Sequence, residues 1–273
     1  MPTVAIVGLG LMGSSFAMAL NAAKGGQTVV GSDRDPHTVR KALEQGIVAS
    51  AAEDLSVVDI ADLVVVAVPI LAMRETLAAL GPRVKGKVVT DMASTKSSVM
   101  QWASAAGIDL VGGHPMCGRE ASGIDAADAE LFRGAPWVLT RDEPSITSLV
   151  TAVGAHQLVM DAAQHDHLVA GVSHAAFLLS VAYVLAVSGR PDWAEASQVA
   201  ASGFRDMSRL AGGDPELYAG IAATNREEIL EQLDGVAAAL TRLRRHLEGN
   251  DPRLAELFEE ARRVRDRWAR ESR

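Results

Sequence analysis

Hydrophobic and polar positions follow two different patterns along this chain, and the change falls near residue 160. Before it, short runs of aliphatic and β-branched residues, typical of buried strands, alternate with stretches of helical spacing. The expected strands cover residues 3–7, 27–31, 61–69, 87–90, 110–111, 135–140 and 157–160. This alternation predicts an α/β fold with a doubly wound parallel sheet over residues 1–161.

After residue 160 the pattern becomes helical throughout, which predicts an all-α domain over residues 162–273. The most apolar stretch, near 164–188, is interrupted by Ser173, His174 and Ser180. We therefore expect a buried core helix there and no membrane span. Thr224-Asn225-Arg226-Glu227 is typical of a capping box, which would start a further helix.

Two narrow apolar stripes mark the last part of the chain, and in the first of them apolar positions recur at alternating spacings of four and three. Such a stripe packs on a partner helix, either within the chain or in a second copy of it. We expect a homodimer interface in the helical domain. The stripes consist of Ile229, Leu233, Val236, Leu240, Leu243 and Leu247, and of Leu254, Leu257, Phe258, Ala261, Val264 and Trp268.

A glycine motif lies between the first expected strand and the first expected helix. Gly8 permits a tight turn, Gly10 leaves room for a pyrophosphate, and Gly13 allows close packing of helix and strand. Leu11 and Met12 belong to the same turn and would contact the cofactor. The motif predicts a dinucleotide site with the pyrophosphate at the N-terminus of the helix.

The residues after the next two strands indicate which cofactor binds. Asp33 lies twenty residues after Gly13, the distance expected for a carboxylate that binds the adenosine ribose. It favours NAD, because a carboxylate repels a 2′-phosphate, whereas the neighbouring Arg34 leaves NADP as an alternative. Val68 and Pro69, at the end of another strand, should border the cofactor.

Composition narrows the class of protein. The net charge of −8, with no obvious basic face, argues against nucleic acid as the main partner. The single cysteine, Cys117, excludes an intramolecular disulfide, and no metal-ligand spacing is present. Because the chain enters a strand directly at its start, with no visible signal peptide, we expect a cytoplasmic protein.

His114 is the first candidate for chemistry. It follows the strand 110–111 and two glycines, on what the sequence predicts to be a tight turn. Histidine titrates near neutral pH, so it can accept a proton from a substrate, with an apparent pKa of about six to seven if unperturbed. Ser94 and Lys96 follow the strand 87–90 at the same sheet edge, where a helix N-cap and a solvated charge are alternatives to a direct role.

Taken together, the motifs resemble those of the prephenate/arogenate dehydrogenases of tyrosine biosynthesis. Related two-domain dehydrogenases use a lysine in the helical domain, but this chain has no lysine after Lys96. The matching pieces are Gly8 to Gly13, Asp91-Met92-Ala93-Ser94-Thr95-Lys96, Gly112-Gly113-His114-Pro115-Met116, His165-Asp166-His167, Val172-Ser173-His174 and Gly203-Phe204-Arg205-Asp206-Met207-Ser208-Arg209.

The resemblance implies roles for individual residues. His114 would be the catalytic histidine that hydrogen-bonds the ring hydroxyl of the substrate, and Ser94, which also borders the cofactor, would orient that hydroxyl. Arg209 would bind a substrate carboxylate. Glu120 and Asp166 would belong to an ionic network that gates the pocket.

The resemblance also implies that Ser173 and His174 contribute to substrate binding, and here the sequence departs from the family pattern. Family members often carry a further histidine at the position of Phe177, so the preference between a keto-acid and an amino-acid side chain is open. Cys117 replaces a frequent alanine, and Tyr218 stands where a tryptophan can occur. No regulatory domain is expected after Arg273.

The expected activity is oxidation and decarboxylation of prephenate or arogenate, with a hydride passing to NAD, or to NADP. Two alternatives remain at this point: a related dehydrogenase that acts on another acid, such as an amino-substituted prephenate, and a non-catalytic NAD-binding dimer. Only the non-catalytic alternative predicts cofactor binding without turnover.

Overall fold

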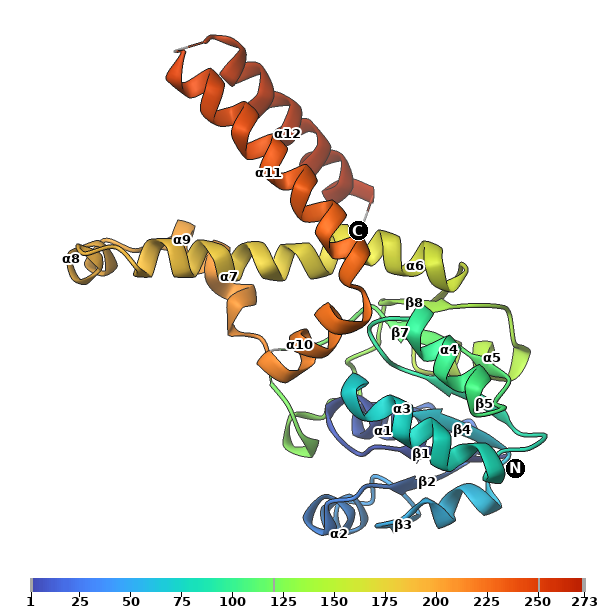
Figure 1. Ribbon diagram of the computed structural model, residues 1–273. Coiled ribbons are helices and arrows are strands. Elements are labelled where there is room, and N and C mark those ends of the chain that lie inside the picture. The colour runs from blue at the N-terminus through green and yellow to red at the C-terminus, as the bar shows by residue number, and fades with distance from the viewer. Residues whose placement is uncertain (1, 120, 250, 272–273) are drawn as a thin grey trace. The chain divides into compact units, whose positions relative to one another are not determined.

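The computed structural model describes residues 2–119, 121–249 and 251–271, in two compact units, Met1–Glu228 and Ile229–Arg273. The first unit contains two sheets and the helices around them (Figure 1). Six parallel strands form the main sheet, in the order β3 (Ser50–Ala52), β2 (Thr28–Ser32), β1 (Thr3–Val7), β4 (Leu63–Val66), β5 (Val88–Asp91) and β6 (Leu110–Val111). The strand order reverses beside β1, as in dinucleotide-binding folds, which confirms the predicted fold class.

Both faces of the main sheet are covered, because successive side chains of a strand point to opposite faces. Val4 and Ile6 of β1 lie in one buried cluster with residues of α1, and Ala5 and Val7 lie in a second cluster with residues of α3. The helices of this α/β part are α1 (Leu11–Ala23), α2 (Pro36–Glu44), α3 (Ile70–Leu80), α4 (Ser97–Ala105) and α5 (Pro144–Ala152), with short 3-10 turns at η1 (Leu55–Ile60), η2 (Gly81–Arg83) and η3 (Ile124–Ala126).

A second, smaller sheet carries His114. Its strands are β7 (Gly113–Pro115), β8 (Pro136–Leu139) and β9 (His156–Val159), with β7 antiparallel to β8 and β8 parallel to β9. The expectation that His114 lies on a tight turn is wrong, since it is the middle residue of β7 and pairs with Val138. Gly112 and Thr140 cause the difference: each donates its backbone N–H to the other residue, which turns the chain away from β6 toward β8.

The rest of the first unit is helical. Its elements are α6 (Ala162–Val169), the π-helical η4 (Ala170–His174), α7 (Ala175–Ser188), α8 (Trp193–Gln198), α9 (Ser202–Ser208), the 3-10 turn η5 (Arg209–Gly212) and α10 (Pro215–Thr224). The capping box predicted at Thr224 is wrong, because Thr224 ends α10 and its hydroxyl donates to the carbonyl of Gly220. Asn225 then separates α10 from the next helix.

Helices α6, η4 and α7 form one continuous rod of 27 residues. The prediction that this rod is a buried core helix is wrong for the single chain, because only 33% of its most apolar window is buried. Leu168, Val172 and Leu185 are 47%, 78% and 66% exposed. Among the described helices it alone is long and apolar enough to cross a membrane, with a mean hydropathy of 2.0, but core helices of soluble proteins share this property.

The second unit begins within α11 (Arg226–Glu248) and continues through α12 (Arg253–Glu271). Figure 1 shows α11 and α12 side by side, and residues of both line one shallow depression. The predicted stripes are only partly covered by this pairing. Their most exposed members, each more than half accessible, are Leu240, Leu247, Phe258, Val264 and Trp268. The compact units divide at residue 228, so the predicted domain boundary at 161 stays a prediction.

Candidate active site

The carboxyl ends of four neighbouring strands bring the sequence motifs to one edge of the main sheet. The glycine turn follows β1, Val68 and Pro69 follow β4, Asp91 ends β5, and Gly112 follows β6. Ligands bind at this edge in doubly wound folds, next to the point where the strand order reverses. The structure therefore gathers the predicted cofactor residues in the expected place.

The glycine turn has the shape that a dinucleotide requires. Gly8 has a φ of +98°, and a Cβ there would lie 2.7 Å from the carbonyl oxygen of Ala67. A Cβ on Gly13 would lie 1.9 Å from the Gly8 carbonyl oxygen, whereas a Cβ on Gly10 would meet nothing within 4 Å. Helix α1 begins right after Gly10 with no side-chain cap and no acidic residue in its first turn. Its amide donors therefore fit a pyrophosphate placed over Gly10.

Asp33 fixes the glycine turn from β2. One carboxylate oxygen accepts the backbone N–H of Leu9 at 2.8 Å, and the other accepts that of Asp35 at 3.0 Å. The carboxylate thus lies directly after β2 and against the turn, where the adenosine ribose would bind. Arg34 is exposed beside it. The cofactor roles of Asp33 and Arg34 stay predictions.

A buried ion pair supports the strand that carries His114. Lys96 and Asp91 are both 0% exposed and paired, and the Lys96 ammonium also donates to the carbonyl of Gly113 at 2.7 Å. Asp91 accepts the backbone N–H of Gly113 at 2.9 Å, so the pair holds both polar groups of that glycine. Of the two alternatives expected for Lys96, the solvated charge is wrong, because the side chain is fully buried. The missed signal is an aspartate at the end of a buried strand with a lysine five residues later.

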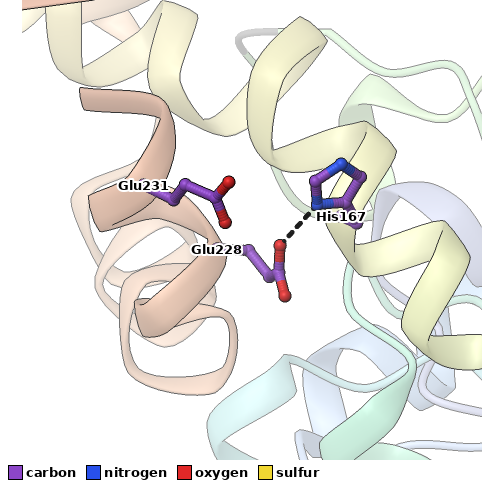
Figure 2. Close-up of side chains that lie close together, drawn as sticks. All are labelled: His167, Glu228 and Glu231. Atoms are coloured by element: carbon purple, nitrogen blue, oxygen red, sulfur yellow. Dashed lines mark hydrogen bonds and ion pairs between the residues drawn. The ribbon is translucent and has the colours of Figure 1, made fainter. Parts of the chain in front are cut away.

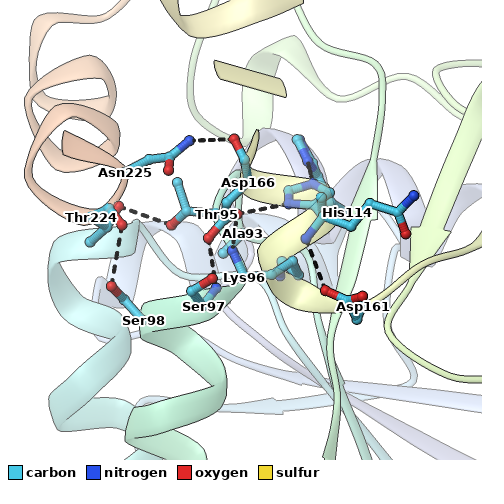
Figure 3. Close-up of polar contacts among 12 residues, drawn as sticks. Ala93, Thr95, Lys96, Ser97, Ser98, His114, Asp161, Asp166, Thr224 and Asn225 are labelled. Carbon is cyan, nitrogen blue, oxygen red and sulfur yellow. Dashed lines mark hydrogen bonds and ion pairs between the residues drawn. The ribbon is translucent and has the colours of Figure 1, made fainter. Parts of the chain in front are cut away.

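His114 is the first of three acid–base side chains that lie in line. Its Nδ1 is 2.8 Å from Nε2 of His165, and Nδ1 of His165 is 2.8 Å from Oδ1 of Asp166. His165 and Asp166 are buried on α6, whereas His114 is partly exposed. Figure 3 shows Asp166 next to the first residues of α4, where its two oxygens accept the backbone N–H groups of Lys96 at 2.7 Å and Ser97 at 2.8 Å.

The surroundings of His114 disfavour its charged form. Burial lowers the pKa of His114 well below 6.5, and the nearby His165, Lys96 and His174 lower it further. The sequence-based expectation of an unperturbed pKa near six to seven is therefore wrong. At neutral pH His114 is neutral and keeps a lone pair, which is the state that a general base needs.

His174 lies behind this line of side chains, at the end of the π-helical turn η4. It is 2% exposed, and its Nδ1 is 3.1 Å from the side-chain nitrogen of Asn225, while no described group bonds its Nε2. The same Asn225 nitrogen donates to the backbone carbonyl of Asp166 at 2.8 Å. Burial lowers the pKa of His174 to about 4. A π-helical turn inside an α-helix is frequent at functional sites.

Other predicted site residues are more accessible to solvent than His165 and Asp166. Ser94 lies half-buried in the bend between β5 and α4, and Ser173 lies half-buried in η4. Arg209 is exposed at the first residue of η5, and Glu120 lies outside the described residues. Phe177, where the family pattern has a histidine, is buried and stacks on Tyr218 with ring centroids 3.3 Å apart. Sequence reasoning did not find this stacking.

The fold and the site define a class of protein, a dinucleotide-dependent dehydrogenase with a helical domain after its α/β domain. The family model for the prephenate dehydrogenase nucleotide-binding domain matches residues 16–159, and that for the prephenate dehydrogenase dimerization domain matches residues 161–260. The chain belongs to the prephenate dehydrogenase family and is an NAD(P)-dependent oxidoreductase.

Individual relatives agree with the family. The chain is similar to the prephenate dehydrogenase of Lactococcus lactis, with 32% identity over 97% of this chain and 77% of that protein. Among solved structures it is similar to Synechocystis arogenate dehydrogenase, with 33% identity, a TM-score of 0.85, and coverage of 97% and 99% of the two chains. It is also similar to prephenate dehydrogenase from A. aeolicus in complex with hydroxyphenyl propionate and NAD+, with 26% identity, a TM-score of 0.91 and coverage of 98% of both chains.

Proposed function

We propose that this protein oxidises and decarboxylates prephenate, or its amino-acid counterpart arogenate, to the corresponding phenol in tyrosine biosynthesis, with NAD as the cofactor. One observation carries the proposal: a neutral histidine, His114, lies in β7 two residues after Gly112, next to the main-sheet edge that presents the glycine turn, and is hydrogen-bonded to His165. A non-catalytic NAD-binding protein would have no use for this arrangement.

When bound, the nicotinamide supplies the hydride acceptor. His114 takes the hydroxyl proton of the cyclohexadienol as the ring carbon becomes carbonyl-like. Loss of CO2 then leaves its bonding electrons in the ring, which becomes aromatic, and His114 returns the proton to the phenol oxygen. General base assistance of this kind contributes about 10²–10⁴ in rate.

The other predicted residues bind and orient the substrate in this proposal. Arg209 pairs with a substrate carboxylate, because a guanidinium binds carboxylates in a bidentate manner. Ser94 orients the ring hydroxyl, and Ser173 and His174 border the substrate. Glu120 and Asp166 contribute to the ionic network around it. The geometry of Asp166 supports an indirect role, since backbone groups and His165 occupy both its oxygens.

We also propose that the protein is a cytoplasmic homodimer. The matched dimerization domain supports the assembly, as do the exposed apolar side chains of the 162–188 rod and of α11 and α12. A second copy is the occupant that the family's domain supports, and it would remove these side chains from water. The free thiol of Cys117 is compatible with a reducing compartment.

The experiment is a steady-state assay of reduced nicotinamide with four combinations of prephenate or arogenate and NAD or NADP. We expect turnover with at least one substrate and higher kcat/KM with NAD. Phe177, which stacks on Tyr218, stands where family members often carry a histidine, so the two substrates have to be compared directly. Cofactor binding without turnover of either substrate, or turnover only of an amino-substituted prephenate, would contradict the proposal.

A further inference from the structure

The side chains of His114, His165 and Asp166 form a continuous hydrogen-bonded line from the partly exposed His114 on β7 to the buried Asp166 on α6. The first step joins β7 to α6 at 2.8 Å, and the second lies within α6 at 2.8 Å. His165 is 0% exposed and Asp166 is 2% exposed, so water does not replace either partner. Geometry of this kind decides which ring nitrogens carry protons.

Asp166 determines which nitrogen of His165 carries a proton. Burial by itself raises its pKa, but hydrogen bonds from His165 and from the backbone of Ser97 and Lys96 bring the pKa below its ordinary value. An ionised carboxylate only accepts hydrogen bonds, so Nδ1 of His165 must carry a proton and donate it to Oδ1.

The tautomer of His114 depends on that of His165. A neutral His165 with its proton on Nδ1 has a lone pair on Nε2, so it can only accept at that atom. Nδ1 of His114 must therefore be the donor across the 2.8 Å contact. This leaves the lone pair of neutral His114 on Nε2, the nitrogen that is free to face a substrate.

We propose that His165 is a positioning residue that fixes His114 in its Nδ1–H form and takes over that proton when His114 accepts one from the substrate. The inference rests on the proposed function, because it assigns a partner to the base of that reaction. Asp166 holds His165 in place and stabilises the positive charge that reaches it. Nothing in the sequence pattern alone pairs these two histidines.

The proton transfers balance without another reactant. The substrate O–H bond breaks and an N–H bond forms at Nε2 of His114, while the Nδ1 proton of His114 moves to Nε2 of His165. His165 is then an imidazolium beside the Asp166 carboxylate, and His114 is neutral again. Both transfers reverse when the phenol oxygen takes its proton back, so no net proton is gained or lost.

The electrostatic surroundings favour this displacement of charge. His114 faces positive or titratable groups from several elements, namely Lys96 at the start of α4, His165 on α6 and His174 in η4, and these disfavour a charge on its ring. Asp91 is already paired with Lys96. His165, in contrast, directly contacts a carboxylate. A positive charge is therefore better accommodated one histidine further from the substrate.

The first test needs no substitution in the line itself. Two-bond ¹⁵N–¹H correlation spectra of the full chain with ¹⁵N-labelled histidine report the tautomer of each of the seven histidines. His114→Asn assigns the His114 signals. We expect the Nδ1–H tautomer at His114 in the NAD-bound protein, and the Nε2–H tautomer there would overturn the proposal.

The second test uses variants of His165. His165→Gln keeps an acceptor oxygen near the position of Nε2 but cannot take a proton, whereas His165→Leu removes both functions. We expect kcat to fall about 10-fold in the first, which is less than the full contribution of a general base, and about 100-fold in the second, at the lower end of that contribution. We expect KM to change less than about twofold, and His114 to lose its pure Nδ1–H signature only in His165→Leu.

The control is His167→Gln on the same helix. His167 is exposed, and its Nδ1 is 2.7 Å from Oε2 of Glu228 (Figure 2). Its kcat should stay within about twofold of the wild type. If His165→Leu fails to bind NAD because it does not fold, the tautomer of His114 in the wild-type spectrum and the kcat of His165→Gln test the proposal.

The outcomes separate the two proposals. A His165→Leu protein with wild-type kcat, beside a His114→Asn protein that has lost its activity, would overturn the role of His165 and leave the proposed function intact. Wild-type kcat in His114→Asn would instead overturn the proposed function.

Discussion

Lys96 and Asp91 form an ion pair in which neither side chain touches solvent, and both hold the backbone of Gly113, the residue before His114. Burial lowers the pKa of Lys96, against the opposing effect of the Asp91 carboxylate. Burying two charges costs desolvation free energy, which their mutual attraction offsets. Removing one partner leaves the other charge buried and uncompensated. The position of β7 therefore depends on the ion pair at the end of β5.

Lys96→Met should lower the free energy of unfolding by about 3–5 kcal/mol, because it leaves the Asp91 carboxylate buried without its partner. Denaturant unfolding of the full chain measures this. Lys85→Met, at an exposed lysine of the same domain, is the matched control and should stay within about 0.5 kcal/mol. A Lys96→Met protein as stable as the control would show that the pair does not stabilise this edge.

Stability should fall in mild acid because of His174. Its folded-state pKa of about 4 lies below its unfolded value of 6.5, so between these pH values only the unfolded chain takes up the proton. The contribution is complete above pH 6.5 and is lost as the pH falls toward 4, at up to about 1.4 kcal/mol per pH unit. Unfolding free energies measured from pH 7.5 to 4.5 should show a shallower decline in His174→Gln than in the control His156→Gln. Equal slopes would mean that His174 does not remain neutral when folded.

Asp33 should select NAD over NADP. Asp33→Ser removes both the carboxylate that would accept the ribose hydroxyls and its repulsion of a 2′-phosphate, so kcat/KM should move toward NADP. Because Asp33 also accepts the Leu9 N–H, Asp33→Asn is the control that keeps an acceptor at the turn. An unchanged ratio of kcat/KM for the two cofactors in Asp33→Ser would remove Asp33 from the cofactor site.

The protein should be a dimer in solution. Light scattering at micromolar concentration should give about 57 kDa, twice the 28.7 kDa of one chain. Leu185→Glu on the exposed face of α7 should weaken the dimer, since it places a charge where the apolar rod would be covered. A mass near 29 kDa for the wild type would contradict the dimer and would mean that the apolar stripes pack within one chain.

The sequence predicted the elements whose signals are local. The runs at β1 and β4 are continuous and apolar, so the strands of the sheet were predictable. The glycines from Gly8 to Gly13 allow the tight turn that connects β1 to α1, so the edge that would bind the cofactor was predictable as well. His114 was found for the same reason, through its glycines, although its strand belongs to a second sheet.

Other features depend on contacts between distant segments, which residue patterns do not encode. His165 meets His114 only because α6 packs against the start of α4, where Asp166 binds two backbone N–H groups. Burial of Lys96 likewise depends on its contacts with Asp91 and with Gly113 of β7, so the residue type alone left both a solvated charge and a direct role open. The sequence of the apolar rod predicted a buried helix, because its composition is that of a core helix. Composition does not say whether the same chain or a second copy buries it.

In the proposed reaction His114 is the base and Arg209 binds a substrate carboxylate, and one set of steady-state kinetics tests both roles. With prephenate and NAD, His114→Asn should lower kcat about 10²-fold or more with little change in KM, since it acts in the transition state. Arg209→Ala should chiefly raise KM, with a loss of about 2–5 kcal/mol in kcat/KM. The acidic limb of the wild-type pH profile should lie below pH 6.5, because the pKa of His114 is lowered, and it should vanish in His114→Asn. If His114→Asn chiefly raises KM, or if neither variant changes kcat or KM more than about threefold, the chemistry does not occur at this site.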